Sequence, residues 1–458
     1  MVVRRVMVAA LAVLAGLVAG CGEEEVRGPN DPITVWTNEF QPDRLDATEA
    51  ILADFTKESG IRTRLVPIPE GQLATLTINA AAAGEMPEVV LSNSMADSQG
   101  YAAQGMYDAR AAQHVVERLG RDTFSPEALR LVEADGVATG VPSDAWGMLL
   151  LYRRDVFRDA GLDAPRTLAD VRAAAERLNG SDMAGITLAT GAGDGFTSET
   201  VEHIALAYGC DLVDDDGDVV FDSPQCVDAL RYYGDLARKF SPPGAQDVET
   251  TRGTYFAGRA AMTFWSPFLL DGMAGLRDDT VPSCPQCKGN PAFLAENSGL
   301  VGPIAGPGGE ATQFGSVSTF NVGAKTDTRA AQELIEYMMT DGYVRWLALS
   351  PQGKFPVRPG PEPGSTEYID AWNRLESGVD RKAPLSRFYS DEALDALREG
   401  ITSLDRWAFA QGQGALLGAL SAEQPIADAG AEVIAGADPG EVAAETADVV
   451  KEIQASLE

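Results

Sequence analysis

The segment between Ile33 and Ser94 alternates strand-like and helix-like patterns, and this alternation limits the folds open to the chain. Three short apolar runs, 33–36, 61–68 and 86–91, have the length and composition of buried strands. The two stretches between them space their apolar residues three or four apart and end at a glycine, as amphipathic helices do. Strand, helix, strand, helix, strand is the order of a doubly wound sheet, so we predict an α/β fold with a mostly parallel sheet.

Polar residues follow two of these predicted strands. Ligands of doubly wound sheets bind just beyond the carboxyl ends of the strands. Residues 36–39 (Trp-Thr-Asn-Glu) and 92–94 (Ser-Asn-Ser) stand at such ends, so both segments are candidates for a site by position alone. A further predicted strand, 185–189, leads into the glycine-rich loop 191–196. That loop lacks the spacing and the Lys-Ser/Thr pair of a phosphate-binding loop.

The middle of the chain carries a turn followed by an apolar run. Residues 140–142 (Gly-Val-Pro) form a turn at which a chain can change direction or domain. Residues 148–152 then have the pattern of a buried strand. With 458 residues, 45% of them hydrophobic, the chain can bury two or three cores, so we expect at least two lobes. The Gly/Pro-rich stretch 299–309 is a second candidate crossing between lobes.

The chain is strongly acidic, with a formal net charge of −32 at pH 7. A surface of this sign repels phosphate backbones and anionic lipid headgroups, so we expect no nucleic-acid partner. The two histidines, His114 and His203, are far apart in the sequence and offer little material for histidine-based chemistry. The acidic stretch 214–218 would put Leu212 at the first position of a calcium loop, so we interpret it as an Asp-Gly hairpin turn. We expect no metal and no cofactor.

Residues 1–20 have the pattern of a signal peptide. Arg4 and Arg5 give a positive start, and 6–18 is an apolar segment of signal-peptide length, short for a membrane span. The small residues before Cys21 look like a bacterial lipobox, which implies cleavage after Gly20 and a thioether-linked lipid on Cys21. A plain secretory signal that happens to end near a cysteine is the alternative. Cleavage would remove both arginines and take the net charge from −32 to −34.

The segment 21–31 that follows is polar and acidic and contains Gly and Pro, so we predict a flexible tether. No other stretch of the sequence is long and apolar enough to span a bilayer. We therefore expect a mature protein that lies outside the membrane and is anchored to it by the lipid on Cys21.

A series of short motifs follows in order along the chain. They are residues 33–36, 81–89 (Ala-Ala-Ala-Gly-Glu-Met-Pro-Glu-Val), 104–108 (Gln-Gly-Met-Tyr-Asp), 140–142 with 151–157 (Leu-Tyr-Arg-Arg-Asp-Val-Phe), 160–162, 165–168, 256–262 (Phe-Ala-Gly-Arg-Ala-Ala-Met) and 356–358 (Pro-Val-Arg). Together with the lipobox, this ordered set resembles the family 1 extracellular solute-binding proteins of bacterial ABC importers, a group that includes carbohydrate-binding lipoproteins. The chain departs from that pattern at Arg153, where the family often has Tyr-Asn, and in its four cysteines beyond Cys21.

The resemblance implies a two-lobed, periplasmic-binding-protein-like clamp. Each lobe would be a doubly wound, mostly parallel sheet, with hinge crossings between the lobes. We expect residues 31–141 and 312–350 in lobe I, and 142–304 and 352–458 in lobe II. The implied function is that of a monomer without enzymatic activity, which captures a sugar or oligosaccharide outside the cytoplasm and delivers it to the permease subunits of an ABC importer.

The resemblance also implies a ligand-binding cleft between the lobes. Trp36, Trp146 and Trp265 stand at strand ends that would face this cleft, and aromatic faces suit the C–H surfaces of sugars. Polar side chains at the other strand ends can exchange hydrogen bonds with sugar hydroxyls. The full set of predicted ligand-binding residues is Trp36, Glu39, Asn93, Ser94, Asp144, Trp146, Asp194, Phe196, Trp265, Ser266, Phe314 and Arg358.

The four remaining cysteines fit an extracytoplasmic location. Cys210 and Cys226 are placed to form a disulfide around the predicted hairpin. Cys284 and Cys287 could form a tight disulfide loop, a redox dithiol or half of a zinc site. Zinc would need two more ligands, and the other cysteine pair is spaced too widely for a zinc ribbon, so we favour a structural disulfide.

Two alternatives stay open. The same fold could bind a polyamine or another small cation, which the acidic surface would tolerate. A site in which aromatic residues surround several carboxylates would favour this ligand. A secreted glycoside hydrolase would need two carboxylates across a bound sugar, and a chain with 68 acidic residues could hold such a pair by chance. No Gly-x-Ser-x-Gly or His-Glu-x-x-His motif is present in the sequence.

Overall fold

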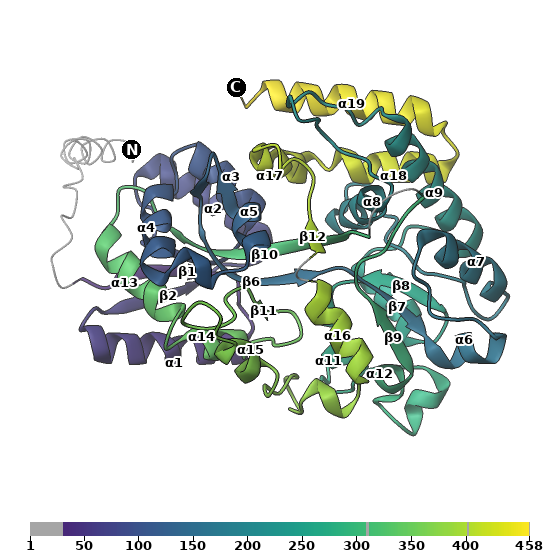
Figure 1. Cartoon of the computed structure of the whole chain (residues 1–458), viewed down its shortest axis with the longest axis horizontal. Coiled ribbons are helices and arrows are strands. Elements are labelled where there is room, and N and C mark those ends of the chain that lie inside the picture. Colours follow the sequence, from purple (N-terminus) through teal and green to yellow (C-terminus); the bar gives the residue numbers. More distant parts are fainter. Residues whose placement is uncertain (1–30, 308–310, 401–402, 458) are drawn as a thin grey trace, which may run out of the picture.

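The computed structural model describes residues 31–307, 311–400 and 403–457. The chain folds into two α/β lobes, which lie left and right in Figure 1 with the C-terminal helices along the top edge. The predicted two-lobed fold is thus confirmed. The predicted signal peptide (1–20), Cys21 and the predicted tether up to residue 30 lie outside the described residues.

Lobe I is built on the larger sheet, whose strand order is β11-β6-β10-β3-β1-β2, with β12 paired to β10. The strands are β1 (Ile33–Thr37), β2 (Thr63–Pro67), β3 (Val89–Ser94), β6 (Val141–Gly147), β10 (Gln313–Val322), β11 (Phe355–Pro356) and β12 (Leu404–Asp405). Strand β1 runs parallel to β2 and β3, as the strand–helix alternation predicts. Strand β10 lies antiparallel between β3 and β6, so a strand from far along the chain completes the sheet.

Helices cover this sheet on both faces. They are α1 (Pro42–Ser59), α2 (Glu70–Ala83), α3 (Met95–Ala103), α4 (Ala109–Leu119), α5 (Pro126–Val132), α13 (Thr328–Met338), α14 (Tyr343–Leu347) and α15 (Glu367–Trp372). A short hairpin, β4 (Glu133–Ala134) and β5 (Val137–Ala138), follows α5. Helix α1 starts with Pro42 in its first turn and stops at Gly60, whose left-handed conformation (φ 77°) a residue with a Cβ would adopt less readily.

Lobe II is built on a smaller sheet with the order β8-β7-β9. Its strands β7 (Leu149–Arg153), β8 (Met262–Trp265) and β9 (Ser298–Val301) pair antiparallel, whereas we expected a mostly parallel sheet in each lobe. The predicted strand 185–189 contributes only isolated parallel bridges, such as Thr187 to Thr263. The lobe's helices are α6 (Arg154–Ala160), α7 (Leu168–Leu178), α8 (Gly195–Ala207), α9 (Pro224–Phe240), α10 (Val248–Phe256), α11 (Leu270–Met273), α12 (Phe293–Asn297) and α16 (Asp391–Gly400).

Several chain segments connect the lobes. The first leaves the large sheet at the end of β6 and enters β7, so the crossing lies at Gly147 and Met148, after the turn at 140–142 where we expected it. A second returns from β9 to β10, a third leads from α15 to α16, and a fourth runs from α16 to β12. Strand β11 and helix α15 fall within the range predicted for lobe II, yet they pack against β6 and α14. The lobe bounds themselves stay a prediction.

The C-terminal helices bridge both lobes. Helix α17 (Gly414–Glu423) packs against α3 of lobe I, whereas α18 (Pro425–Ala435) and α19 (Pro439–Ala455) pack against α9 of lobe II, with α18 also on α8. The contact with α3 is close, because a Cβ at Gly418 would lie 3.2 Å from the Ala96 carbonyl oxygen. The chain therefore alternates between lobes up to its end.

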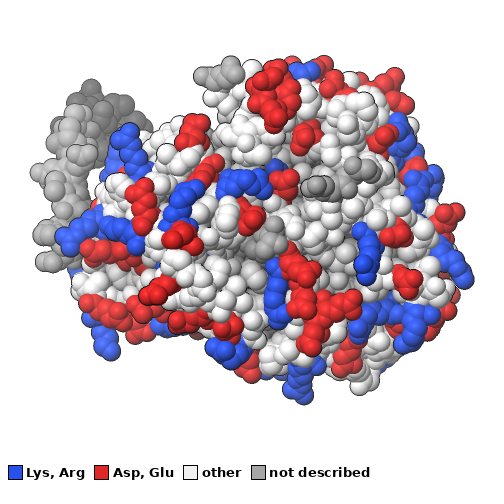
Figure 2. Space-filling model, viewed as in Figure 1, with Lys and Arg blue, Asp and Glu red and all other residues white. Residues whose placement is uncertain are grey.

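Acidic and basic side chains are interspersed over both lobes on the face drawn in Figure 2. Among the described residues, no helix is long and apolar enough to cross a membrane. The same part of the chain holds no group of three or more His, Cys, Asp or Glu side chains that could bind a metal ion.

Both predicted disulfides are present. Cys210 and Cys226, 16 residues apart, are bonded across the segment between α8 and α9, and Cys284 is bonded to Cys287. The enclosed stretch 214–218 forms the predicted turn: the Asp214 amide donates to the Asp218 carbonyl, and Gly217 adopts a positive φ of 88°. The first bridge thus ties the ends of two helices of lobe II together.

A buried lysine joins three segments of lobe I. The Lys354 side chain is 2% exposed, and its Nζ lies 2.7 Å from Glu39, just after β1, and 3.5 Å from Asp144 in β6. The ammonium also lies 4.5 Å from the ring centre of Trp346 in α14, whose Nε1 donates to Asp144. Arg44 in α1 forms a further ion pair with Glu39, with 2.6 Å between Nη1 and Oε2. These paired charges fix the loop after β1 against the sheet.

The ion pairs decide the protonation of Glu39. Burial by itself would raise the pKa of Glu39, but the charges of Lys354 and Arg44 and the hydrogen bonds they donate outweigh it. Together they lower the pKa from 4.5 to about 2.

Replacing Cys210 and Cys226 together by alanine should lower the free energy of unfolding by about 3 kcal/mol, because a bridge closing a loop of roughly 15 residues restricts the unfolded chain by that much. Urea denaturation of the mature domain, truncated after Cys21 (residues 22–458), measures this. The matched control replaces Cys284 and Cys287, which close a much shorter loop, so the loss should be under about 2 kcal/mol. An equal loss for both pairs would contradict the loop-length argument.

The low pKa of Glu39 predicts acid sensitivity. Because the pKa is lower in the folded state, this carboxylate stabilises the fold above about pH 4.5, and the contribution is lost as the pH falls toward about 2. In Glu39→Gln the free energy of unfolding, measured by urea denaturation at a series of pH values, should fall less over that window than in the parent. Asp43→Asn, which removes an exposed carboxylate nearby, serves as the control and should follow the parent. Identical profiles for the parent and Glu39→Gln would refute the assignment.

Candidate ligand-binding cleft

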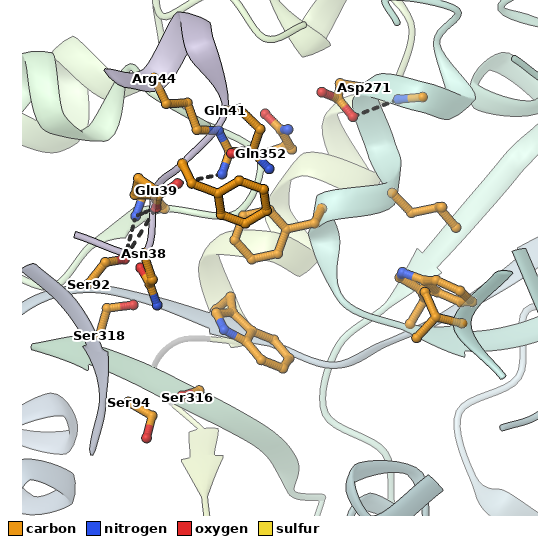
Figure 3. A pocket seen from close by; sticks show the side chains of 18 of the residues that line it. Asn38, Glu39, Gln41, Arg44, Ser92, Ser94, Asp271, Ser316, Ser318 and Gln352 are labelled. Atoms are coloured by element: carbon orange, nitrogen blue, oxygen red, sulfur yellow. Dashed lines mark hydrogen bonds and ion pairs between the residues drawn. The ribbon is translucent and has the colours of Figure 1, made fainter. Parts of the chain in front are cut away.

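A cleft of about 610 Å³ lies between the lobes, and residues from both lobes line it. Lobe I and its connections supply Asn38, Glu39, Phe40, Gln41, Arg44, Leu73, Ala74, Ser92, Asn93, Ser94, Asp97, Trp146, Ser316, Ser318, Gln352 and Lys354. Lobe II supplies Glu199, Val248, Arg252, Phe256, Trp265, Phe268, Leu269, Asp271, Gly272, Arg277, Asp279 and Thr280. Figure 3 shows Glu39 and Ser92 close together on one side of the cleft, with Asp271 across from them.

The lobe I wall consists largely of amides and hydroxyls. This wall arises from the parallel pairing of β1 and β3, because the carboxyl ends of the two strands lie at the same edge of the sheet. Asn38 and Gln41 follow β1, while Ser92 and Asn93 end β3. Strand β10 adds two further serines from the antiparallel neighbour, Ser316 and Ser318.

Three of the amide oxygens in this wall are left without a partner. Gln41 Oε1, Asn93 Oδ1 and Gln352 Oε1 are buried and accept no hydrogen bond from any described residue. The Asn93 amide is held in place from its other end, where Nδ2 donates to the Tyr107 hydroxyl at 3.2 Å. These oxygens are covered by neighbouring atoms, so a ligand in the cleft meets other polar atoms of the same wall.

Aromatic rings from both lobes line the cleft. Trp146 from β6 meets Phe268 edge-on, with ring centres 6.4 Å apart. Phe268 fits there because residue 353 is glycine: a Cβ at Gly353 would overlap the phenyl ring. Trp265 ends β8 and packs against Phe196 with ring centres 4.6 Å apart. Such rings present apolar faces to a ligand whose edges bind to the polar wall.

The basic side chains of the cleft are paired with the protein's own carboxylates. Besides Arg44 and Lys354, described above, Arg252 pairs with Glu249 and Arg277 with Asp279. Arg277 also approaches buried Asp271, with 3.6 Å between Nη1 and Oδ2. Burial raises the pKa of Asp271, and the Arg277 charge offsets only part of this rise. The cleft thus offers a ligand mainly uncharged polar groups and aromatic faces.

Five predicted ligand-binding residues line this cleft: Glu39, Asn93, Ser94, Trp146 and Trp265. Their roles differ. The Ser94 hydroxyl already accepts a hydrogen bond from the Asp97 amide and caps α3, and both oxygens of Glu39 are bound to cations. Trp146 is half-buried, so part of its ring remains accessible from the cleft.

Seven other predicted residues do not line it, and each has a structural role. Trp36 packs against the small cluster of Ile68, Leu73 and their neighbours, and Asp144 lies buried between Lys354 and Trp346. The remaining five are Asp194, which caps α8; Phe196, which supports Trp265; Ser266, which precedes the short 3-10 helix Pro267–Leu269; Phe314, which lies under the Arg406 guanidinium; and Arg358.

Arg358, which was predicted from the Pro-Val-Arg motif, does not line the cleft. Its guanidinium is buried and donates hydrogen bonds to the Thr123 hydroxyl and to the carbonyls of Met339 and Leu119, each at 2.8 Å. It therefore holds segments of lobe I together.

Sequence reasoning missed several residues of the cleft, above all Gln352, Lys354 and Phe268. The first two stand just before the Pro-Val-Arg motif at 356–358, and Phe268 follows the Trp-Ser-Pro stretch that the prediction did include. The lysine between Gly353 and Phe355 gives only a weak sequence signal. Lysine is almost never buried unless it is paired, and the partners of Lys354 lie far away in the sequence.

The fold is shared with solved sugar-binding proteins. The sugar-binding protein MalE from the phytopathogen Xanthomonas citri is 19% identical, with a TM-score of 0.71 over 93% of this chain and 98% of that one. The GacH receptor of Streptomyces glaucescens GLA.O, whose structure was also solved with acarbose, is 19% identical, with a TM-score of 0.69 over 92% of this chain and 98% of that one.

Sequence comparison assigns the family. The Escherichia coli (strain K12) protein YcjN, which carries the name of an ABC transporter periplasmic-binding protein, is 28% identical over 368 residues, or 78% of this chain and 80% of that protein. The family described as bacterial extracellular solute-binding protein matches residues 41–345, well over half of the chain. The chain therefore belongs to the bacterial extracellular solute-binding protein family.

Proposed function

We propose that the chain is the lipid-anchored, extracytoplasmic binding component of an ABC importer, which captures a sugar or oligosaccharide in the interlobe cleft and delivers it to the membrane permease. The family supports a solute-binding role rather than an enzymatic one. The name of the relative YcjN supports an ABC transporter, and the lipobox-like residues before Cys21 support the anchor.

The composition of the cleft carries the sugar assignment. Sugars present hydroxyls at their edges and C–H groups on their faces. The amide and hydroxyl side chains of the lobe I wall match the hydroxyls, and the rings of Trp146 and Phe268 match the faces. The sugar-binding protein MalE, which shares the fold, agrees with this assignment.

A polyamine would need carboxylates that are still available for an ammonium group. Of the five acidic side chains that line the cleft, Glu39 is bound to Lys354 and Arg44, and Asp271 and Asp279 are bound to Arg277. A cation would have to displace an internal partner from each of these three. The other two are Glu199 and Asp97, and burial raises the pKa of Asp97, which disfavours its charged form. These conditions make the neutral ligand the better match, with the polyamine as an outcome that the binding experiment distinguishes.

Replacing Trp146 by alanine should weaken sugar binding at least about tenfold, equivalent to about 1.4 kcal/mol, because the ligand loses an aromatic face. The measurement is a thermal-shift screen of the mature domain with sugars, polyols and polyamines, followed by calorimetric titration of the best sugar. Trp36→Ala is the matched control: the ring lies outside the cleft, so the affinity should stay unchanged even if the melting temperature falls.

Three outcomes would contradict the proposal. A shift with spermidine and none with sugars would move the ligand to cations. An equal loss of affinity in Trp36→Ala and Trp146→Ala would remove the cleft assignment. Hydrolysis of an oligosaccharide during the titration would mean that the protein is an enzyme.

Lipidation of Cys21 can be tested independently of ligand binding. In the full chain expressed in a bacterium, Cys21→Ala should abolish incorporation of radiolabelled palmitate, because the residue that carries the lipid is gone. Cys284→Ala serves as the control and should still be labelled. Equal labelling of Cys21→Ala and the parent chain would contradict lipidation at Cys21.

A further inference from the structure

Three segments that connect the lobes meet around one buried side chain, that of Gln313 at the start of β10. The side chain is 1% exposed. Its neighbours include three glycines: Gly147 on the segment from β6 to β7, Gly302 on the segment from β9 to β10, and Gly400 on the segment from α16 to β12. One amide thus contacts three of the connections between the lobes.

The glycines make room for this amide. A Cβ at Gly147 would lie 2.5 Å from Gln313 Nε2, and a Cβ at Gly302 would lie 3.3 Å from Oε1. A Cβ at Gly400 would overlap Oε1. Because protein interiors are close-packed, the three segments cannot rotate relative to one another without changing their contacts with this side chain.

The hydrogen bonds of the amide are only half satisfied. Gln313 Nε2 donates to the Met148 carbonyl at 2.7 Å, which holds the first connection. Oε1 is buried and accepts no hydrogen bond from any described residue. A buried acceptor without a donor is costly, so an arrangement of the connections that brings a donor to Oε1 would gain stability.

The amide also adjoins the ligand cleft. A small cavity of about 10 Å³ is lined by Gln313 together with Trp146 and Gln352, and both of these residues line the large cleft as well. A ligand that contacts Trp146 or Gln352 therefore acts on direct neighbours of the space beside Gln313.

We propose that Gln313 is the positioning residue that sets the relative placement of the two lobes, and thereby the balance between open and closed forms of the cleft. This inference rests on the proposed function in one respect: it takes closure of the lobes around a ligand as the movement that Gln313 controls. Its test uses the ligand-free protein, so the identity of the ligand does not enter the result.

The experiment measures the distance between the lobes in the ligand-free mature domain by double electron–electron resonance. Nitroxide labels are placed on exposed helical positions of the two lobes with Ala53→Cys in α1 and Ala173→Cys in α7. In Gln313→Met, which keeps the length of the side chain but lacks the amide, the interlobe distance distribution should shift or broaden. Gln313→Asn, whose amide is too short to reach the Met148 carbonyl in the same way, provides a second variant if the first fails to fold.

The matched control is Gln332→Met in α13. Gln332 is also buried, and its Nε2 donates to the Ala111 carbonyl at 3.0 Å, but it lies within lobe I away from the connections. This variant should lower the melting temperature and leave the distance distribution unchanged. The proposal is overturned if the folded Gln313 variants keep the parent distribution, or if Gln332→Met changes it equally. A failure of sugar binding in the earlier screen would leave this result standing.

Discussion

The buried ammonium of Lys354 is the constraint on which the shape of the cleft depends. An isolated charge cannot be buried at an acceptable cost, so Lys354 requires carboxylates close by. Glu39 supplies one from the loop after β1, and Asp144 supplies the other from β6. The pairing holds the loop after β1 in place, and this loop carries Asn38 and Gln41 into the cleft. The polar wall is therefore preorganised by an interaction that no ligand has to make.

Because of these ion pairs, the strongly negative net charge of the molecule does not determine which groups a ligand meets in the cleft. The chain is strongly acidic, yet the carboxylates of Glu39, Asp271 and Asp279 at the cleft are bound to basic side chains of the protein. Charge on the outer surface keeps such a protein soluble and shapes its encounters, whereas recognition inside depends on amides, hydroxyls and rings. This division is consistent with a neutral ligand in an acidic protein.

The sequence predicts what local pattern controls, and it fails where distant segments decide. Alternating strands and helices indicated the α/β fold, and the rule for strand ends located Glu39 and Asn93. The antiparallel sheet of lobe II was not visible, because pairing direction depends on strands far apart in the chain. Asp144 was assigned to the ligand for the same reason: its partner Lys354 comes about two hundred residues later, and the burial of that lysine can be seen only in the folded chain.

The packing of α17 on α3 has a consequence for how the protein is made. Helix α3 is synthesised early and α17 almost last, so the surface of α3 that α17 covers stays uncovered on the ribosome until nearly the whole chain exists. The large sheet is likewise incomplete until β10, which pairs with β3, has been synthesised. Long-range contacts of this kind slow folding and leave apolar surface exposed meanwhile. Neither lobe can therefore be produced as a contiguous fragment.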